Sequence, residues 1–187
     1  MLPMRLRRPA CLVLPLVLVA IAAACGGGAG GGADAPPPAG PAVNAAGAEL
    51  LPTEADALPE FDLDAYDALL GQLRGTPIVV NLWASWCGPC AEEAPRLAAA
   101  HAAYGERVQF LGVDVLDTAD GARPFIARQG WRYPSVADPD GAIRDGLGLL
   151  GLPVTLFYGS DGTLVASYTG PIPEAELEAR IAEILGG

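Results

Sequence analysis

Two cysteines separated by two residues, Cys87 and Cys90, constrain this chain more than any other feature. They stand where an apolar, strand-like run over residues 78–83 gives way to a helical pattern. A cysteine at the start of a helix meets unpaired backbone N–H groups and the positive end of the helix dipole, which favour the thiolate. Cys90 follows one helical turn later, where it can attack a mixed disulfide formed at Cys87. The spacing therefore predicts thiol-disulfide exchange, with Cys87 as the nucleophile and Cys90 as the resolving residue.

The neighbouring residues fit this chemistry better than metal or haem binding. Pro89 suits the first turn of a helix, which has no N–H partner to lose, and Gly88 leaves the approach to Cys87 unhindered. A tetrahedral zinc site needs four ligands, whereas the chain has no second Cys-x-x-Cys pair and one histidine, His101, predicted on a surface helix. Covalent haem attachment needs a histidine where Ala91 stands. We therefore expect no metal and no cofactor other than the redox-active disulfide itself.

The stretch Val80–Cys90, followed by Glu92-Glu93-Ala94-Pro95, resembles the extracytoplasmic thioredoxin-like proteins of the TlpA/ResA/DsbE type. The resemblance covers residues 58–187 and implies an α/β, thioredoxin-like fold with a central mixed sheet flanked by helices and a TlpA-type α/β insertion. It also implies a cis-proline at Pro153 that faces the dithiol. The residue before it, Leu152, would then offer backbone hydrogen bonds to a client chain. The plainer alternative is a proline that only opens a strand.

The resemblance also gives Glu93 a role. Cytosolic thioredoxin carries a buried aspartate near the dithiol, and the matching residue here is Asn81, which cannot titrate. Glu93 matches the acidic residue that the TlpA/ResA type places near the active-site cysteines. It would accept the proton of Cys90 if it is partly buried with a raised pKa, whereas the alternative is a solvent-facing carboxylate, as we expect for Glu92.

Tryptophans flank the cysteine pair and recur later. We expect Trp83 in the core and Trp86, beside the nucleophile, to present a flat apolar surface to clients. Residues 131–133 (Trp-Arg-Tyr) lie in the insertion, where they either select clients or pack.

The remaining pattern alternates apolar runs with helical spacing, which favours parallel strands between helices. We expect strands over 58–63, 78–83, 108–115, 134–137, 153–158 and 163–168, and helices over 63–73, 88–104 (kinked at Pro95), 120–129, 142–147 and 173–185.

The N-terminus predicts export. Residues 1–24 have a basic start and an apolar run that is too short for a membrane span of about 20 residues, as in a signal peptide. Ala22-Ala23-Ala24-Cys25 resembles a lipoprotein cleavage site that leaves a lipid on Cys25, although ordinary cleavage and a free thiol are the alternative. The Gly/Pro/Ala-rich residues 25–57 are predicted to form a tether to a domain over 58–187. Cys11 leaves with the signal peptide, so only the Cys87/Cys90 pair stays in the folded body.

Charge and family resemblance together define the expected partners. The net charge of −11 argues against nucleic acid. By resemblance, we expect a reductase that is tethered to the extracytoplasmic face of the bacterial membrane, or secreted if Cys25 carries no lipid. Its clients would be disulfide-bearing exported proteins such as apocytochrome c before haem attachment, and its electrons would come from a membrane thiol carrier of the CcdA/DsbD type. The pair Gly88-Pro89 favours this reducing direction.

Other activities stay open or are excluded. A disulfide-forming oxidase of exported proteins is one alternative, and a copper(I) metallochaperone that uses the two thiolates is another. A peroxiredoxin-like peroxidase is excluded, because the sequence has no Pro-x-x-x-Thr-x-x-Cys pattern.

Overall fold

The apolar run before the cysteines becomes β1 (Ile78–Trp83), the central strand of a mixed sheet. The computed structural model describes residues 47–187, so the predictions for the signal peptide, for Cys25 and for the tether up to residue 46 lie outside the described residues. The strand order is β3-β2-β1-β4-β5. The other four strands are β2 (Gln109–Val115), β3 (Ser135–Asp138), β4 (Val154–Tyr158) and β5 (Leu164–Thr169).

Strand direction reverses twice across the sheet, on either side of β4. Strands β1, β2 and β3 run parallel, whereas β4 is antiparallel to β1 and β5 is antiparallel to β4. The predicted α/β insertion supplies α3 (Ala119–Gln129), β3 and α4 (Ala142–Gly146), and it places β3 at one edge of the sheet. This is the mixed sheet flanked by helices that the sequence predicts.

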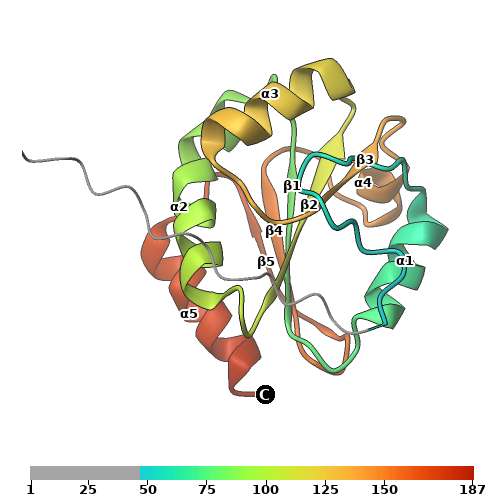
Figure 1. Ribbon diagram of the computed structural model, residues 1–187. Coiled ribbons are helices and arrows are strands. Elements are labelled where there is room, and N and C mark those ends of the chain that lie inside the picture. Colours follow the sequence, from blue (N-terminus) through green and yellow to red (C-terminus); the bar gives the residue numbers. More distant parts are fainter. Residues whose placement is uncertain (1–46) are drawn as a thin grey trace, which may run out of the picture. The chain divides into compact units, whose positions relative to one another are not determined.

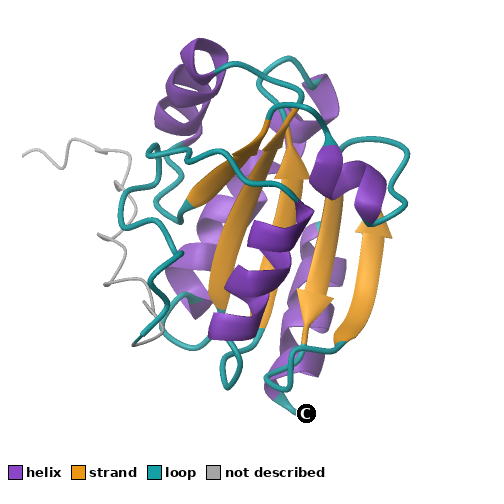
Figure 2. Cartoon of the chain, turned by 90° about the vertical axis from the view of Figure 1, so that its right-hand side faces the viewer, coloured by secondary structure: helices purple, strands orange, loops and turns teal. Residues whose placement is uncertain are grey.

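Alternation along β1 divides the core into two layers (Figures 1 and 2). Ile78, Val80 and Leu82 face α1 (Leu63–Gln72) and α4. Val79 and Trp83 face the other way, into a cluster with residues of α2 (Gly88–Tyr104), α3 and α5 (Glu174–Leu185). Side chains at odd positions of β1 therefore point toward the helix that carries the cysteines.

The N-terminal boundary differs from the prediction. Leu51 is buried against α1, and the backbone N–H of Leu50 donates to Gln72 Oε1 at 3.0 Å. The folded body thus includes residues that the sequence assigned to the tether. The strand predicted over 58–63 is only a single bridge, between Glu60 and Ala137. Pro59 has no N–H to extend the pairing, and α1 already begins at Leu63.

The prediction that His101 lies on a surface helix is wrong. The buried stripe of α2 recurs every three or four residues and includes Cys90, Ala94, Leu97 and His101. The His101 ring packs edge-on against the rings of Phe110 and Tyr133, with centroids 5.4 and 5.5 Å apart, and burial lowers its pKa.

The aromatic residues of the insertion pack in the core. The side chains of Trp131 and Tyr133 are buried, and the indole N–H of Trp131 donates to the carbonyl of Ala94 at 3.1 Å. Client selection by these two side chains is therefore ruled out by their burial. None of the helices within residues 47–187 is long and apolar enough to cross a membrane.

Candidate active site

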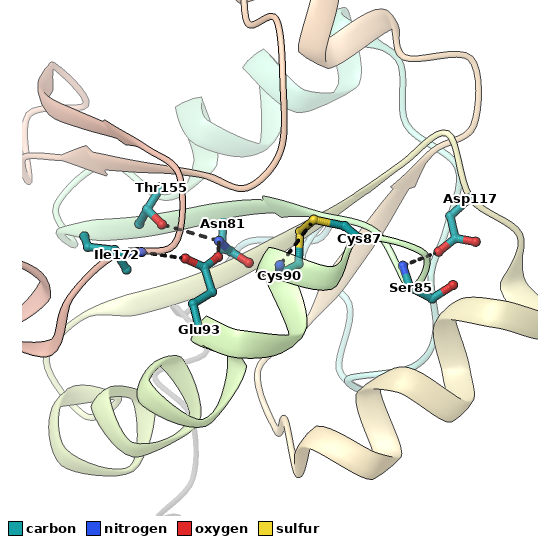
Figure 3. The surroundings of a disulfide bond; sticks show 8 residues. All are labelled: Asn81, Ser85, Cys87, Cys90, Glu93, Asp117, Thr155 and Ile172. Atoms are coloured by element: carbon teal, nitrogen blue, oxygen red, sulfur yellow. Dashed lines mark hydrogen bonds between the residues drawn. A yellow bond between two sulfur atoms is a disulfide. The ribbon is translucent and has the colours of Figure 1, made fainter.

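The two cysteines form a disulfide at the junction of β1 and α2 (Figure 3). Cys87 is the N-cap residue of α2, and its Sγ accepts a hydrogen bond from the backbone N–H of Cys90 at 3.2 Å. Cys87 retains 5% exposure, whereas Cys90 has none. The geometry thus makes Cys87 the sulfur that a client can reach, and it supplies the N–H donor that favours a thiolate there.

The two residues between the cysteines leave one side of the disulfide open. Pro89 lies in the first turn of α2, as predicted. A Cβ atom added at Gly88 would have no neighbour within 4 Å. The side of the turn at Gly88 is therefore free of packing.

Glu93 is fully buried one turn after Cys90. Its Oε1 accepts from Asn81 Nδ2 at 2.8 Å, and its Oε2 accepts from the backbone N–H of Ile172 at 2.9 Å (Figure 3). Burial raises the pKa of Glu93 from 4.5 to about 7, against the opposing effect of these two donors and of the positive charge of Arg96. Both conditions set for a proton acceptor, burial and a raised pKa, are met.

Asn81 links this carboxyl group to the neighbouring strand. Residues Asn81 and Thr155 are opposite each other in the β1/β4 pair, and Asn81 Nδ2 lies 3.3 Å from Thr155 Oγ1. The amide oxygen Oδ1 of Asn81 is buried and has no hydrogen-bond partner among residues 47–187. The amide group therefore keeps one unused acceptor beside Glu93.

The peptide bond between Leu152 and Pro153 is cis, as the resemblance implies. Pro153 is buried immediately before β4, and its carbonyl accepts from the N–H of Gly170 at 2.9 Å. Leu152 is half-buried, and no backbone hydrogen bond in the described part of the chain uses its N–H or C=O. These two groups are available to an added strand.

Trp86 is 61% exposed beside Cys87. Its indole N–H donates to the carbonyl of Leu116 at 3.1 Å, which fixes the ring against the loop after β2. Leu116 has a left-handed backbone (φ 51°), a conformation that costs a non-glycine residue about 1 kcal/mol. Its side chain is also exposed. The loop thus presents a second apolar side chain next to the tryptophan.

Comparison with known proteins places this geometry in a family. The model of the AhpC/TSA family matches residues 55–167, which is more than half of the chain. The chain belongs to the AhpC/TSA family. It is 32% identical to the thiol:disulfide interchange protein HelX of Rhodobacter capsulatus over 144 residues, 76% of each chain. It is 28% identical to the thiol-disulfide oxidoreductase ResA of Bacillus subtilis over 134 residues, 70% of this chain and 74% of ResA.

A solved structure of similar fold agrees with these relatives. The secreted Mycobacterium tuberculosis disulfide oxidoreductase homologous to Escherichia coli DsbE superposes with a TM-score of 0.56 and 28% identity. The superposition covers 60% of this chain and 85% of that one. This AhpC/TSA-family protein is therefore a thiol-disulfide oxidoreductase with a thioredoxin-like fold.

The sequence did not indicate several of the hydrogen bonds around the two cysteines and Glu93. The backbone N–H of Ile172 donates to Glu93, and Thr155 accepts from Asn81, the other partner of Glu93. Both groups come from segments that are distant in the sequence. Asp117 accepts the backbone N–H of Ser85, two residues before Cys87, at 2.5 Å. Asp114 is a charged residue inside the predicted buried strand 108–115. Its position was the one sequence feature that pointed to a polar group near the end of this strand.

Proposed function

We propose that the protein reduces disulfides of exported proteins, with Cys87 as nucleophile, Cys90 as resolving thiol and Glu93 as proton acceptor. The observation that carries this proposal is the buried carboxyl group of Glu93, one helical turn beyond Cys90, whose pKa of about 7 suits proton transfer near neutral pH. The reducing direction rests on the Gly88-Pro89 pair and on the family resemblance.

The first step uses the reduced enzyme. The Cys87 thiolate, stabilised by the N-terminus of α2 and by the N–H of Cys90, attacks one sulfur of the client disulfide. A bond forms between Cys87 and that client sulfur. The client disulfide breaks, and its other sulfur leaves as a thiolate.

The second step releases the client. The buried Cys90 thiol gives its proton to Glu93, and the Cys90 sulfur attacks Cys87. The mixed disulfide breaks, so the second client sulfur also leaves as a thiolate. The client has gained two electrons, and the enzyme is left with the Cys87–Cys90 disulfide. A membrane thiol carrier of the CcdA/DsbD type would restore the dithiol by the reverse exchange.

Two features support the docking of an extended client segment. The free N–H and C=O of Leu152 offer the hydrogen bonds of a short added strand beside cis-Pro153. The exposed side chain of Trp86 offers apolar surface beside Cys87, which suits an apolar residue next to the client cysteine. Apocytochrome c before haem attachment is the client class that the family resemblance favours.

Location rests on the N-terminal sequence. We infer a lipid on Cys25 that holds the domain at the extracytoplasmic face of the bacterial membrane, since residues 22–25 resemble a lipoprotein cleavage site. Replacing Cys25 with alanine should move the protein from the membrane fraction to the soluble fraction. An unchanged distribution would exclude the anchor.

The role of Glu93 is tested by Glu93→Gln in single-turnover reduction of a disulfide peptide. We expect attack by Cys87 at the normal rate and resolution of the mixed disulfide slowed roughly 10²- to 10⁴-fold, the range for loss of a positioned acid or base. The matched control is Glu92→Gln, which changes the exposed neighbouring carboxylate. Equal resolution rates in wild type and Glu93→Gln would refute the assignment.

A further inference from the structure

A second buried carboxyl group lies on β2 and has no role in the exchange steps above. Asp114 is 2% exposed, and its Oδ1 has no hydrogen-bond donor among the residues that the structure describes. An ionised carboxylate without a donor would be very costly to bury. The group therefore needs either a proton or a partner.

The partner is Asp117, three residues later in the loop after β2. Both oxygens of Asp117 already accept backbone N–H groups, Oδ2 from Ser85 at 2.5 Å and Oδ1 from Thr118 at 2.7 Å. Burial raises the pKa of the Asp114 carboxyl group, and the charge of Asp117 and a hydrogen bond with that residue raise it further. Two carboxylates in contact cannot both be ionised at neutral pH, so the pair must share a proton.

The side on which this proton lies follows from the donors. Asp117 has two N–H donors and is partly exposed, which stabilises its charge. Asp114 is buried with its Oδ1 unpartnered, and burial together with the charge of Asp117 raises the pKa of Asp114 to about 8. Asp114 thus donates its O–H, and Asp117 accepts it.

We propose that the protonated Asp114 and the ionised Asp117 are positioning residues that clamp the Ser85–Cys87 segment, and with it the nucleophile, to β2. Figure 3 shows Asp117 and Ser85 on the opposite side of the disulfide from Glu93. The same loop also holds Trp86, through the carbonyl of Leu116. The segment before Cys87 is thus tied twice to residues 114–117.

Other charged groups around Asp114 are occupied elsewhere. In α3, Asp120 is exposed, and Arg123 donates to the carbonyl of Asp56 at 3.2 Å. Asp138, at the end of β3, accepts the N–H groups of Ile143 and Arg144. On α2, the carboxyl group of Glu93 is bonded to Asn81 and to the Ile172 N–H, and the two sulfurs form the disulfide. Proton loss from Asp114 is therefore governed by Asp117.

The clamp predicts a pH-dependent loosening of the nucleophile. Below pH 8 the proton joins the two carboxyl groups. Above it, two adjacent negative charges repel, and Asp117 can no longer hold both Asp114 and the Ser85 N–H. The catalytic consequence rests on the proposed role of Cys87, whereas the clamp itself is measurable in the oxidised protein without a client.

The test follows the Ser85 backbone amide by NMR in the oxidised, ¹⁵N-labelled protein from pH 6 to 9.5. Ser85 is one of only four serines in the chain, so selective labelling identifies its signal. We expect its proton shift to titrate with a midpoint near pH 8 in the wild type. In Asp114→Asn, whose side-chain N–H₂ replaces the acid proton, the shift should stay constant over this range.

Two further variants keep the test decisive. Asp120→Asn, the matched exposed control, should titrate as the wild type does, and Asp117→Asn should move the Ser85 signal at every pH because its charged acceptor is lost. A flat wild-type titration, or one that persists in Asp114→Asn, would overturn the clamp. If the clamp holds the nucleophile, the rate of client reduction will show an inflection near pH 8 in the wild type that Asp114→Asn lacks. A wild-type protein that shows the Ser85 titration but has no exchange activity would contradict the proposed function and leave the clamp standing.

Discussion

At the scale of single residues, burial of the Glu93 carboxyl group makes the stability of the fold depend on pH. The pKa of its carboxyl group rises from 4.5 to about 7 on folding, so the folded state favours the protonated form. A group with a raised folded pKa stabilises the protein fully below its unfolded pKa, and this contribution disappears as the pH rises through the folded value. The window for Glu93 is therefore pH 4.5 to 7, with roughly 3 kcal/mol lost across it.

Glu93→Gln should remove this pH dependence. The oxidised wild type should lose unfolding free energy between pH 5 and 8, and the variant should lose roughly 3 kcal/mol less. Glutamine fits the site because Asn81 can turn its amide and offer its unpartnered Oδ1 to the new N–H₂ group, while Ile172 keeps its acceptor. Urea unfolding at pH 5, 6, 7 and 8 measures the difference. Parallel curves for the two proteins would show that Glu93 does not titrate in this range.

Residue positions were predictable where local spacing sets them. The position of Cys87 at the start of α2, with Cys90 one turn later, follows from a Cys-x-x-Cys pair at a strand-to-helix junction. The choice of Glu93 came from the family resemblance, and the structure shows that its side chain is buried. Helical periodicity also placed His101 in the core, a consequence that the prediction missed.

At the scale of elements, the short helix α4 leads through a short loop into the cis-proline. Asp138 is fully buried, and its two oxygens accept the N–H groups of Ile143 and Arg144, each at 3.1 Å. The end of α4 is tied to the following loop by a bond from the Leu149 N–H to the Arg144 carbonyl. That loop runs directly into the Leu152–Pro153 bond, so the contacts of Asp138 also order the backbone at which we propose that clients dock.

Asp138→Ala should therefore affect both stability and client binding. We expect a loss of about 1–3 kcal/mol in unfolding free energy, because the N–H groups of Ile143 and Arg144 lose their acceptor. The KM for a disulfide client should rise, with kcat changed less, since the dithiol itself is untouched. Asp140→Ala, which alters the exposed carboxylate two residues later, is the matched control. Equal KM values in wild type and Asp138→Ala would show that α4 does not affect client binding.

Element positions were the best-predicted level of the structure. Long apolar runs and amphipathic spacing gave β1, β2, α2 and α5 within one or two residues. The predicted strand at 58–63 failed, because strand formation there depends on pairing with β3, which is distant in sequence, and Pro59 allows only one bridge.

At the scale of the whole molecule, the site is assembled from segments that no local pattern connects. Glu93 depends on the Ile172 N–H, 79 residues later, and Ser85 depends on Asp117, 32 residues later. Such contacts arise from the order of strands in the sheet, so a single sequence predicts the reacting sulfurs but not the groups that tune them. The family resemblance supplied Glu93 and the cis-proline, and neither the resemblance nor the spacing indicated the carboxyl pair at Asp114.

The direction of exchange is also a property of the whole molecule. Folding changes the reduction potential of the Cys87/Cys90 pair relative to its value in the unfolded chain. By a thermodynamic cycle, this change, converted to a free energy, equals the difference in unfolding free energy between the oxidised and reduced proteins. A strong oxidant such as DsbA, at about −120 mV, owes its potential to a stabilised reduced form, whereas thioredoxin lies near −270 mV. These 150 mV correspond to about 7 kcal/mol.

In the oxidised protein, one hydrogen-bond donor among the described residues reaches the two cysteine sulfurs. One backbone N–H, that of Cys90, reaches Cys87 Sγ, and Cys90 itself is fully buried beside a carboxyl group that favours its own proton below pH 7. We therefore expect the oxidised protein to unfold at a higher urea concentration than the reduced protein, and the pair to equilibrate with thiol buffers near −270 mV. A reduced form that is several kcal/mol more stable, with a potential near −120 mV, would make the protein an oxidant of exported thiols.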